Sequence, residues 1–219
     1  MATSSFINFS AQDFFDILMP ELPGVSQAVV RQELDRTLRD YFRRTGAWQE
    51  RLVPSTSFAV GQVRVDLNEE LERFSAPYKV ANVYAVWDDK TELPQQALVR
   101  SLKEDTRSSQ RRWHCPQRSV VEFSGTAWSV AKDLEYQVAL YPAERGVAYP
   151  QWIWDDHSEA IRYGVLGRMM SQSRKPYSNP VDGRTFTNAY FSEINSAKAE
   201  ADRGNTPAGQ TWHFPRSFA

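Results

Sequence analysis

The sequence predicts an α+β protein: a helical bundle or hairpin with an inserted antiparallel β-rich module, sandwich or barrel-like, and an extended C-terminal arm. Two observations lead to this prediction. Apolar residues recur at helical spacing in residues 1–48 and 150–204, whereas residues 49–149 change to alternation punctuated by turn residues. Residues 205–219 follow neither pattern and form the predicted arm.

Two helices are expected at the start of the chain, on either side of a proline-rich elbow. Ser10 with Asp13 is typical of a helix start, and Met19–Gly24 cannot continue a helix. Ser26 is the expected cap of the second helix and Gly46 its end. The apolar stripe of that helix is Val30, Leu34, Leu38, Tyr41, Phe42 and Thr45. Its opposite face carries charges of both signs and is expected to be solvated: Arg31, Glu33, Asp35, Arg36, Arg39, Asp40, Arg43 and Arg44.

Alternation and turn residues indicate strands in the middle of the chain. The expected strands are residues 63–67, 78–87, 119–123 and 135–141. Asp88–Lys90 is the expected turn after the second of them. Residues 95–106 lack glycine and proline, and Leu98 and Leu102 are four residues apart, so a short helix is expected there. Antiparallel pairing is the simplest arrangement of these strands.

Two more helices are expected after the β-rich module. Asp155–Asp156 is the predicted cap of the first of them. Gly164 and Gly167 each cost a helix about 1 kcal/mol relative to alanine, which suggests that another helix packs closely there. Asn179 followed by Pro180 predicts the start of the last helix, and Gly204 its end. The stripe of that helix is Phe186, Tyr190, Ile194, Ala197 and Ala201.

Composition indicates a soluble, intracellular, globular protein. The 219 residues carry 26 Lys+Arg and 27 Asp+Glu, a net charge of -1, and 41% are hydrophobic, too many for a disordered chain. No apolar run approaches the roughly 18 residues of a membrane span, and the first ten residues lack a signal-peptide pattern. One cysteine, Cys115, excludes an intramolecular disulfide framework.

No constellation of residues predicts an enzyme, a metal site or a cofactor. His114 and Cys115 are neighbours, and neighbours on a strand point to opposite faces. Asp88–Asp89 and Asp155–Asp156 are explained by a turn and a helix cap. His157 falls in an expected first helical turn. The chain contains no metal-binding, Walker or dinucleotide-binding motif. We therefore expect no catalytic residue, no metal and no cofactor.

One segment is locally basic. Arg107, Arg111, Arg112 and Arg118 occur with no acidic residue between the first and the last of them. Positive side chains in a loop can contact the phosphate backbone of DNA without sequence specificity, so these arginines are candidates for residues close to DNA. A solvated loop or a protein contact is the other interpretation of the same residues.

The C-terminal tail has the composition of a docking peptide. Large rings between proline and glycine can act as anchors in the pockets of another protein. The candidate docking residues are Trp212, His213, Phe214, Pro215 and Phe218. A tail that packs on its own domain or stays loose is the alternative.

The order of several short motifs resembles the head-to-tail adaptor proteins of short-tailed bacteriophages, also called tail tubular protein A or head completion proteins. Leu18–Val25 before a helix and Thr45–Trp48 at its end are similar to the opening of that family. A β insertion ending near Tyr141–Pro142, then Ala160–Leu166, then Tyr177–Pro180 continue the same order. The resemblance covers roughly residues 17–204. Each motif alone has a structural explanation, so the specificity of the resemblance lies in the order of the motifs along the chain.

The resemblance implies a structural virion protein assembled in the host cytoplasm. It implies a ring, typically of twelve copies, between the portal protein and the tail nozzle, with double-stranded DNA passing through the lumen. The helices would form the ring body, the β-rich module would face tail components, and the aromatic tail would reach the portal. No membrane partner is implied.

Two other functions stay open from the sequence. One is a monomeric DNA-binding module that uses the segment from Arg107 to Arg118. The other is an unrecognised hydrolase, which would need carboxylates or a His/Cys pair to converge in a pocket.

Overall fold

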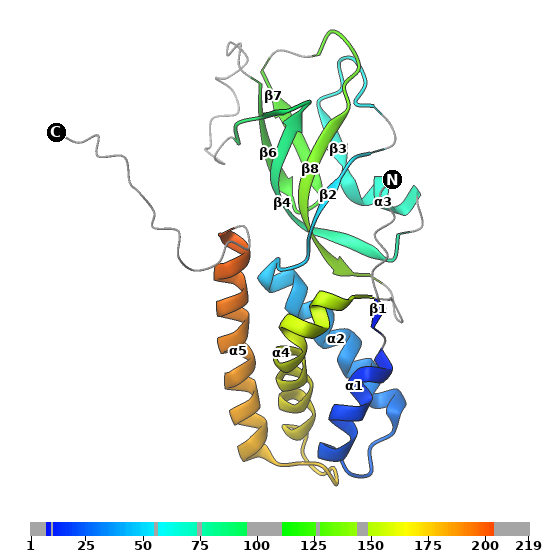
Figure 1. Ribbon diagram of the computed structural model, residues 1–219, viewed down its shortest axis with the longest axis vertical. Helices are drawn as coiled ribbons and strands as arrows, with labels where there is room; N and C mark the ends of the chain where they lie inside the picture. Colours follow the sequence, from blue (N-terminus) through cyan, green and yellow to red (C-terminus); the bar gives the residue numbers. More distant parts are fainter. Residues whose placement is uncertain are drawn as a thin grey trace, which may run out of the picture.

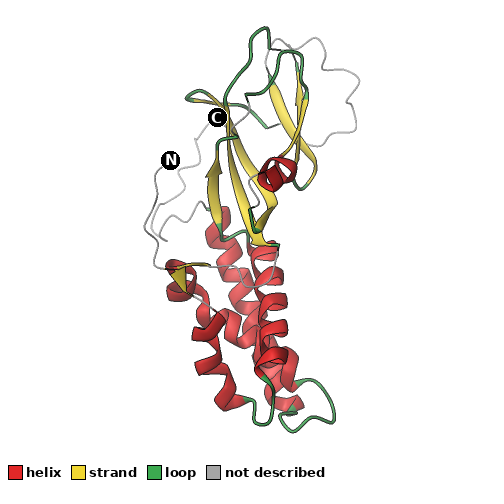
Figure 2. Cartoon of the chain, turned by 90° about the vertical axis from the view of Figure 1, so that its right-hand side faces the viewer, coloured by secondary structure: helices red, strands yellow, loops and turns green. Residues whose placement is uncertain are grey.

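The computed structural model of the protein describes residues 8–9, 11–54, 57–73, 76–95, 111–125, 128–143 and 149–203. The long helices occupy one end of the molecule and most strands the other (Figure 1, Figure 2). The helices are α1 (Ala11–Leu18), the 3-10 helix η1 (Met19–Glu21), α2 (Gln27–Thr45), α3 (Leu67–Arg73), α4 (Gln151–Met170) and α5 (Pro180–Asp202). The strands are β1 (Asn8–Phe9), β2 (Gln49–Leu52), β3 (Arg64–Asp66), β4 (Tyr78–Asp88), β5 (Thr91–Glu92), β6 (Arg112–Gln117), β7 (Val120–Ser124), β8 (Leu134–Pro142) and β9 (Tyr149–Pro150). The predicted α+β class is confirmed.

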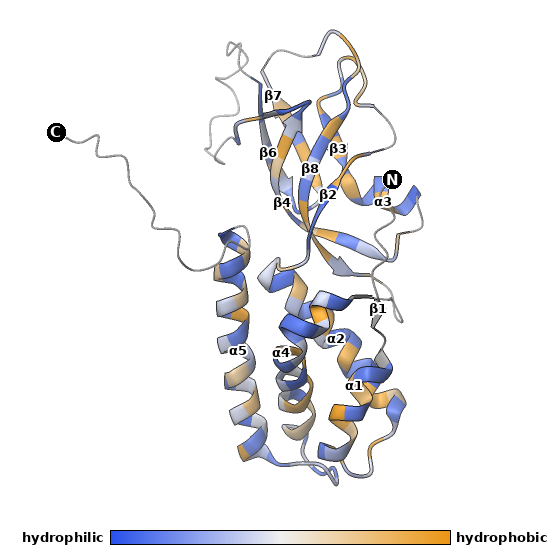
Figure 3. Cartoon of the chain, in the orientation of Figure 1, coloured by the Kyte–Doolittle hydropathy of each residue, from blue (hydrophilic) through white to orange (hydrophobic). Residues whose placement is uncertain are grey.

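We call α1, α2, α4 and α5 the helical body. Helix α2 buries every member of its predicted stripe, and Figure 3 shows polar residues interspersed along the same helix. It ends at Gly46, which takes a left-handed φ of 64° and donates its N–H to the Phe42 carbonyl at 3.0 Å. The predicted Ser26 cap is wrong in one respect, because its side chain makes no capping hydrogen bond within the part of the chain that the structure describes.

Helix α4 begins earlier than the sequence predicts. Asp155 and Asp156 lie inside the helix, so their prediction as a cap is wrong. The reason is that the residues before them already pack: Ile153 is fully buried, and the Trp154 ring meets Phe14 of α1 at 4.9 Å. Helix α5 begins as predicted, with Asn179 accepting the N–H of Asp182.

We call the described residues between 49 and 143 the β-rich module. It has a four-stranded sheet in the order β2-β8-β4-β5 and a three-stranded sheet in the order β3-β7-β6. The paired strands in both sheets are antiparallel, as expected, and apolar residues from both sheets belong to one core. The predicted strands at 78–87, 119–123 and 135–141 are confirmed within one or two residues.

One prediction within the β-rich module is wrong, and one predicted strand is found but is a residue shorter at each end. The strand expected over residues 63–67 stops at Asp66, because the Asp66 carboxylate accepts the N–H of Asn68 and starts α3 at Leu67. The described part of the predicted basic loop, residues 111–118, is largely strand β6, because Trp113 is buried and donates its Nε1–H to the Leu93 carbonyl at 2.9 Å. The short helix expected over residues 95–106 lies almost entirely outside the described residues.

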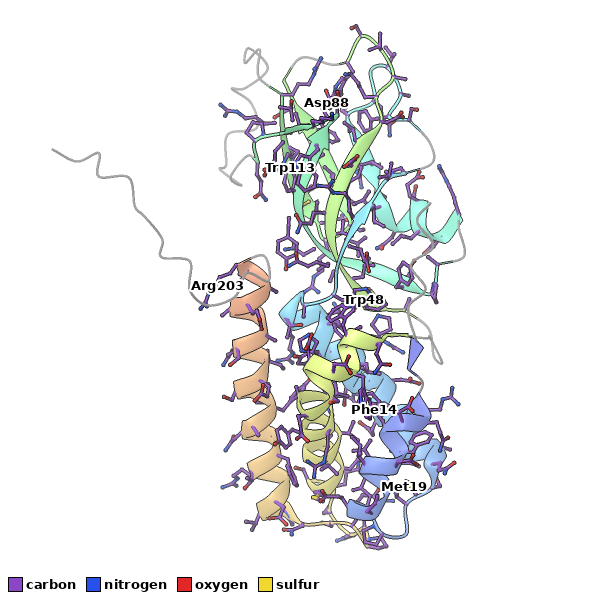
Figure 4. The ribbon with its side chains drawn as sticks, viewed as in Figure 1. Phe14, Met19, Trp48, Asp88, Trp113 and Arg203 are labelled. Atoms are coloured by element: carbon purple, nitrogen blue, oxygen red, sulfur yellow. The ribbon has the colours of Figure 1, made fainter. Side chains whose placement is uncertain are left out.

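The helical body and the β-rich module meet around Trp48, which Figure 4 places between the helices and the strands. The Trp48 ring lies 5.8 Å from Phe42 of α2 and 5.6 Å from Tyr78 of β4. Its carbonyl accepts the N–H of Leu140 at 2.7 Å, and Gln49 Nε2 donates to the carbonyl of Ala201 in α5 at 3.0 Å. The ends of α2 and α5 are therefore tied to the sheet.

Candidate functional site

Three helices of the helical body converge on two glycines of α4. A Cβ atom at Gly164 would lie 2.5 Å from Thr37 Cγ2 of α2 and 2.8 Å from the Tyr190 ring of α5. A Cβ atom at Gly167 would lie 2.9 Å from the backbone nitrogen of Thr187. These distances are too short for real side chains, so glycine lets α4 approach both helices closely.

Asp40 joins the same three helices through polar contacts. Its carboxylate accepts from Arg168 of α4 at 2.9 Å and from the Tyr190 hydroxyl of α5 at 3.3 Å. Arg44, one turn further along α2, donates to it at 2.9 Å. Hydrogen bonds to a charged group contribute about 1.5–3 kcal/mol each, less where solvent reaches them. This network fixes how the helices lie against one another.

A cavity of about 570 Å³ opens between α2, α4 and α5 near their ends at the β-rich module. This volume is large enough to admit a side chain or a small ligand. The residues that line it are Tyr41, Ala47, Trp152, Asp155, Asp156, His157, Glu193, Ser196, Ala197 and Glu200. We call it the acidic cavity, because four of its lining residues are carboxylates. Within the described part of the chain none of the four forms an ion pair.

Tyr41 and His157 form the floor of the acidic cavity. Tyr41 Oη lies 3.1 Å from His157 Nδ1, within hydrogen-bond distance, and the Trp152 ring lies 5.7 Å from the imidazole. Burial lowers the pKa of His157 below its usual 6.5, against the opposing effect of the Asp156 and Glu200 charges. Burial also raises the pKa of Tyr41 well above its usual value. Both groups are therefore uncharged near neutral pH.

The chemistry of the acidic cavity suits a cation. Its floor is uncharged and aromatic, its rim is negative, and a guanidinium or ammonium group gains from both surroundings. Among the described residues, no three histidine, cysteine, aspartate or glutamate side chains come together as ligands for a metal ion.

Sequence reasoning missed the acidic cavity, although one signal was present. Glu193, Ala197 and Glu200 recur at four- and three-residue steps along one face of α5. Tyr41 and His157 are 116 residues apart in the chain, so only the fold brings them together.

The structure divides the predicted basic segment. Arg111 lies 4.0 Å from Asp88 and 4.8 Å from the Trp128 ring centroid, so a carboxylate and a ring already engage it. Arg112 is half-buried in β6, and Arg118 is exposed in the turn before β7. Arg107 lies outside the described residues.

Asp88 is the centre of a cluster at the end of the β-rich module away from the helices (Figure 4). It accepts from Trp128 Nε1 at 3.1 Å and pairs with Lys132 Nζ at 3.1 Å. Burial acts to raise the pKa of Asp88, but Trp128, Lys132 and Arg111 outweigh it and the pKa is lowered. The carboxylate is thus stabilised as the anion. It lies at the predicted turn, where Asp89 has a left-handed φ of 58°.

The other sequence candidates do not come together. His114 Nε2 lies 3.4 Å from Glu122 Oε2, and burial raises the pKa of the neighbouring Cys115 thiol to about 11, which makes it a poor nucleophile at neutral pH. The predicted docking residues, Trp212, His213, Phe214, Pro215 and Phe218, lie outside the described residues, as does Gly204.

Comparison with other proteins adds no assignment: no protein-family model and no curated protein sequence matches the chain. None of the described helices combines the length and the apolar character needed to span a bilayer.

Proposed function

We propose that this chain is a head-to-tail adaptor of a short-tailed bacteriophage, a structural virion protein without enzymatic activity. Copies of it, twelve in the family it resembles, would form a ring between the portal protein and the tail nozzle. Double-stranded DNA would pass through the lumen of that ring without sequence-specific contacts.

One observation carries the proposal: the β-rich module is inserted between two long helices that contact each other. Helix α2 runs into β2 at Gly46–Trp48, and the chain returns to the helical body at α4. This is the order in which the sequence resembles the adaptor family, with Thr45–Trp48 before the insertion and Ala160–Leu166 after it.

Two physical features support a place in a closed ring. A ring of identical copies needs two different surfaces on each copy, each fitting the other on its neighbour. A helical body joined to a β-rich module offers such different surfaces. A net charge of -1 also suits a conduit, because a strongly basic lining would hold DNA by many phosphate contacts.

Electron microscopy of the purified full chain, alone and with portal-containing capsids, tests the proposal. We expect a ring of copies bound to the portal vertex. Deletion of Asn205 to Ala219, the predicted docking tail, should leave a folded protein that no longer attaches to those capsids. Attachment of the truncated chain at the wild-type level would refute the docking role. Capsids that never bind the full chain would refute the adaptor function.

The salt dependence of DNA binding distinguishes the adaptor function from the alternative function, a monomeric DNA-binding module. A module that used Arg111, Arg112 and Arg118 would bind free DNA tightly, with affinity falling steeply as salt rises. An adaptor subunit should bind free DNA weakly. The engagement of Arg111 by Asp88 favours the adaptor.

A further inference from the structure

The acidic cavity holds charge that the described residues do not neutralise. Asp155, Asp156, Glu193 and Glu200 are exposed at its rim, and none of them pairs with a described lysine or arginine. Like charges gathered around one cavity repel one another. A bound cationic group would relieve that repulsion.

The outer face of α2 carries the opposite charge. Arg36 and Arg43 are exposed, and Arg39 lies between them. Of the acidic residues on α2, Asp35 is buried and Asp40 pairs with Arg44 and Arg168. Glu33 approaches Arg36 only at 4.0 Å, and the Arg36 side chain is 70% exposed. The outer face is therefore net positive.

The positive face and the acidic cavity lie on different sides of one molecule. Tyr41 of α2 points into the cavity. At 100° per residue and measured in the same direction, Arg43 lies about 200° around the helix from Tyr41, and Arg36 about 220°. The arginines of one copy therefore point away from the acidic cavity of that same copy.

The two surfaces also match in spacing. Arg36 and Arg43 are seven residues apart on α2, and Glu193 and Glu200 are seven residues apart on α5. Seven residues are two helical turns, about 10.5 Å of rise in each helix. Two helices laid side by side can therefore form two arginine–glutamate pairs at once. The Trp152 ring at the cavity adds a face on which a guanidinium can stack.

We propose that the acidic cavity of one copy receives the Arg36–Arg43 face of α2 from a second copy of this chain. This contact is heterologous, because it joins two different surfaces, and its repetition generates a ring or a filament. The inference rests on the proposed function, since it names the surfaces by which the adaptor ring would form.

Charge reversal tests the contact with the full chain. The variant E193K/E200K makes the cavity rim more positive, and R36E/R43E makes the α2 face negative. E69K/E92K, at exposed positions of the β-rich module, matches the first variant in charge change. Self-association of each protein is measured by sedimentation at low salt, and circular dichroism checks that each is folded.

The expected results are specific to this pairing. Each reversal variant alone should self-associate at least about tenfold more weakly than wild type, and E69K/E92K should behave as wild type. An equimolar mixture of the two reversal variants should recover association, because each altered surface then meets an altered partner and each native surface a native one. Recovery should weaken with added salt.

Four outcomes would overturn the proposal. The first is wild-type association by both reversal variants, and the second is failure of their mixture to recover. The third is a wild-type chain that stays monomeric at low salt, even if rings still form on the portal, which would leave the adaptor function standing. If E193K/E200K self-associates normally but no longer attaches to capsids, the cavity belongs to another protein.

Discussion

Helices α4 and α5 approach through glycine, whereas a large aromatic ring joins the two sheets of the β-rich module, because Trp128 packs on Phe123 of β7 and donates to Asp88 of β4. In the helical body a Cβ atom at Gly167 would lie 2.9 Å from the backbone of α5. In the β-rich module Phe58, Phe123 and Trp128 meet edge to face, with centroids 5.0 to 5.1 Å apart. The helical body should therefore be sensitive to added atoms and the β-rich module to removed ones.

The largest effect is expected from removing a ring. Trp128 is 3% exposed, and Trp128→Ala leaves a cavity between the sheets and removes the hydrogen bond to Asp88. We expect the free energy of unfolding to fall by about 3–5 kcal/mol, measured by urea unfolding. Trp128→Phe, which keeps a ring but loses the donor, should cost less. A loss below about 1 kcal/mol for the alanine variant would show that the rings do not hold the sheets.

Adding one methyl group in the helical body should have the next largest effect. Gly167→Ala places a Cβ atom against the backbone of Thr187, so α5 must shift, and we expect a loss of about 1–3 kcal/mol in urea unfolding. Without crowding, the same change in a helix stabilises by about 1 kcal/mol. The sign of the measured change therefore decides whether the two helices touch there.

The sequence predicted the helical body better than the β-rich module, and the reason is physical. A helix end depends on residues within one turn, so Gly46 and Asn179 were enough to place two ends. Strand β6 depends on Trp113 reaching Leu93, twenty residues away, and local polarity suggested a loop instead. Leu67 fits an alternating strand as well as the helix that it begins, so the hydrophobic pattern alone does not locate the boundary between β3 and α3.

The acidic cavity could be predicted only in part. The glutamates on one face of α5 were visible in the sequence, but the Tyr41 to His157 contact joins two helices separated by the whole β-rich module. The sequence predicts Asp88 in a turn, and it is the last residue of β4, directly before that turn, while its partners Trp128 and Lys132 come from a segment forty residues further on. Long-range polar contacts of this kind leave no periodic signal.

The smallest effect, and the one that best separates the two regions, is the response to acid. Below pH 6.5 the unfolded chain protonates His157 before the folded chain does, because burial lowers the pKa in the fold. The helical body should therefore lose stability as the pH falls from about 6.5 through the lower folded-state pKa. The Asp88 pKa is also lowered in the fold, so its contribution to the β-rich module should persist until the pH falls below about 3.9.

Amide hydrogen exchange across pH 8 to 3 can follow both regions in one sample. His157→Asn should flatten the decline that begins near pH 6.5 and leave the decline below about pH 4 unchanged. Asp88→Asn should do the reverse, since the amide does not titrate and carries no negative charge for Lys132 and Arg111 to stabilise. If each variant altered exchange over its own pH range in both regions, the helical body and the β-rich module would unfold as one cooperative unit, joined through Trp48.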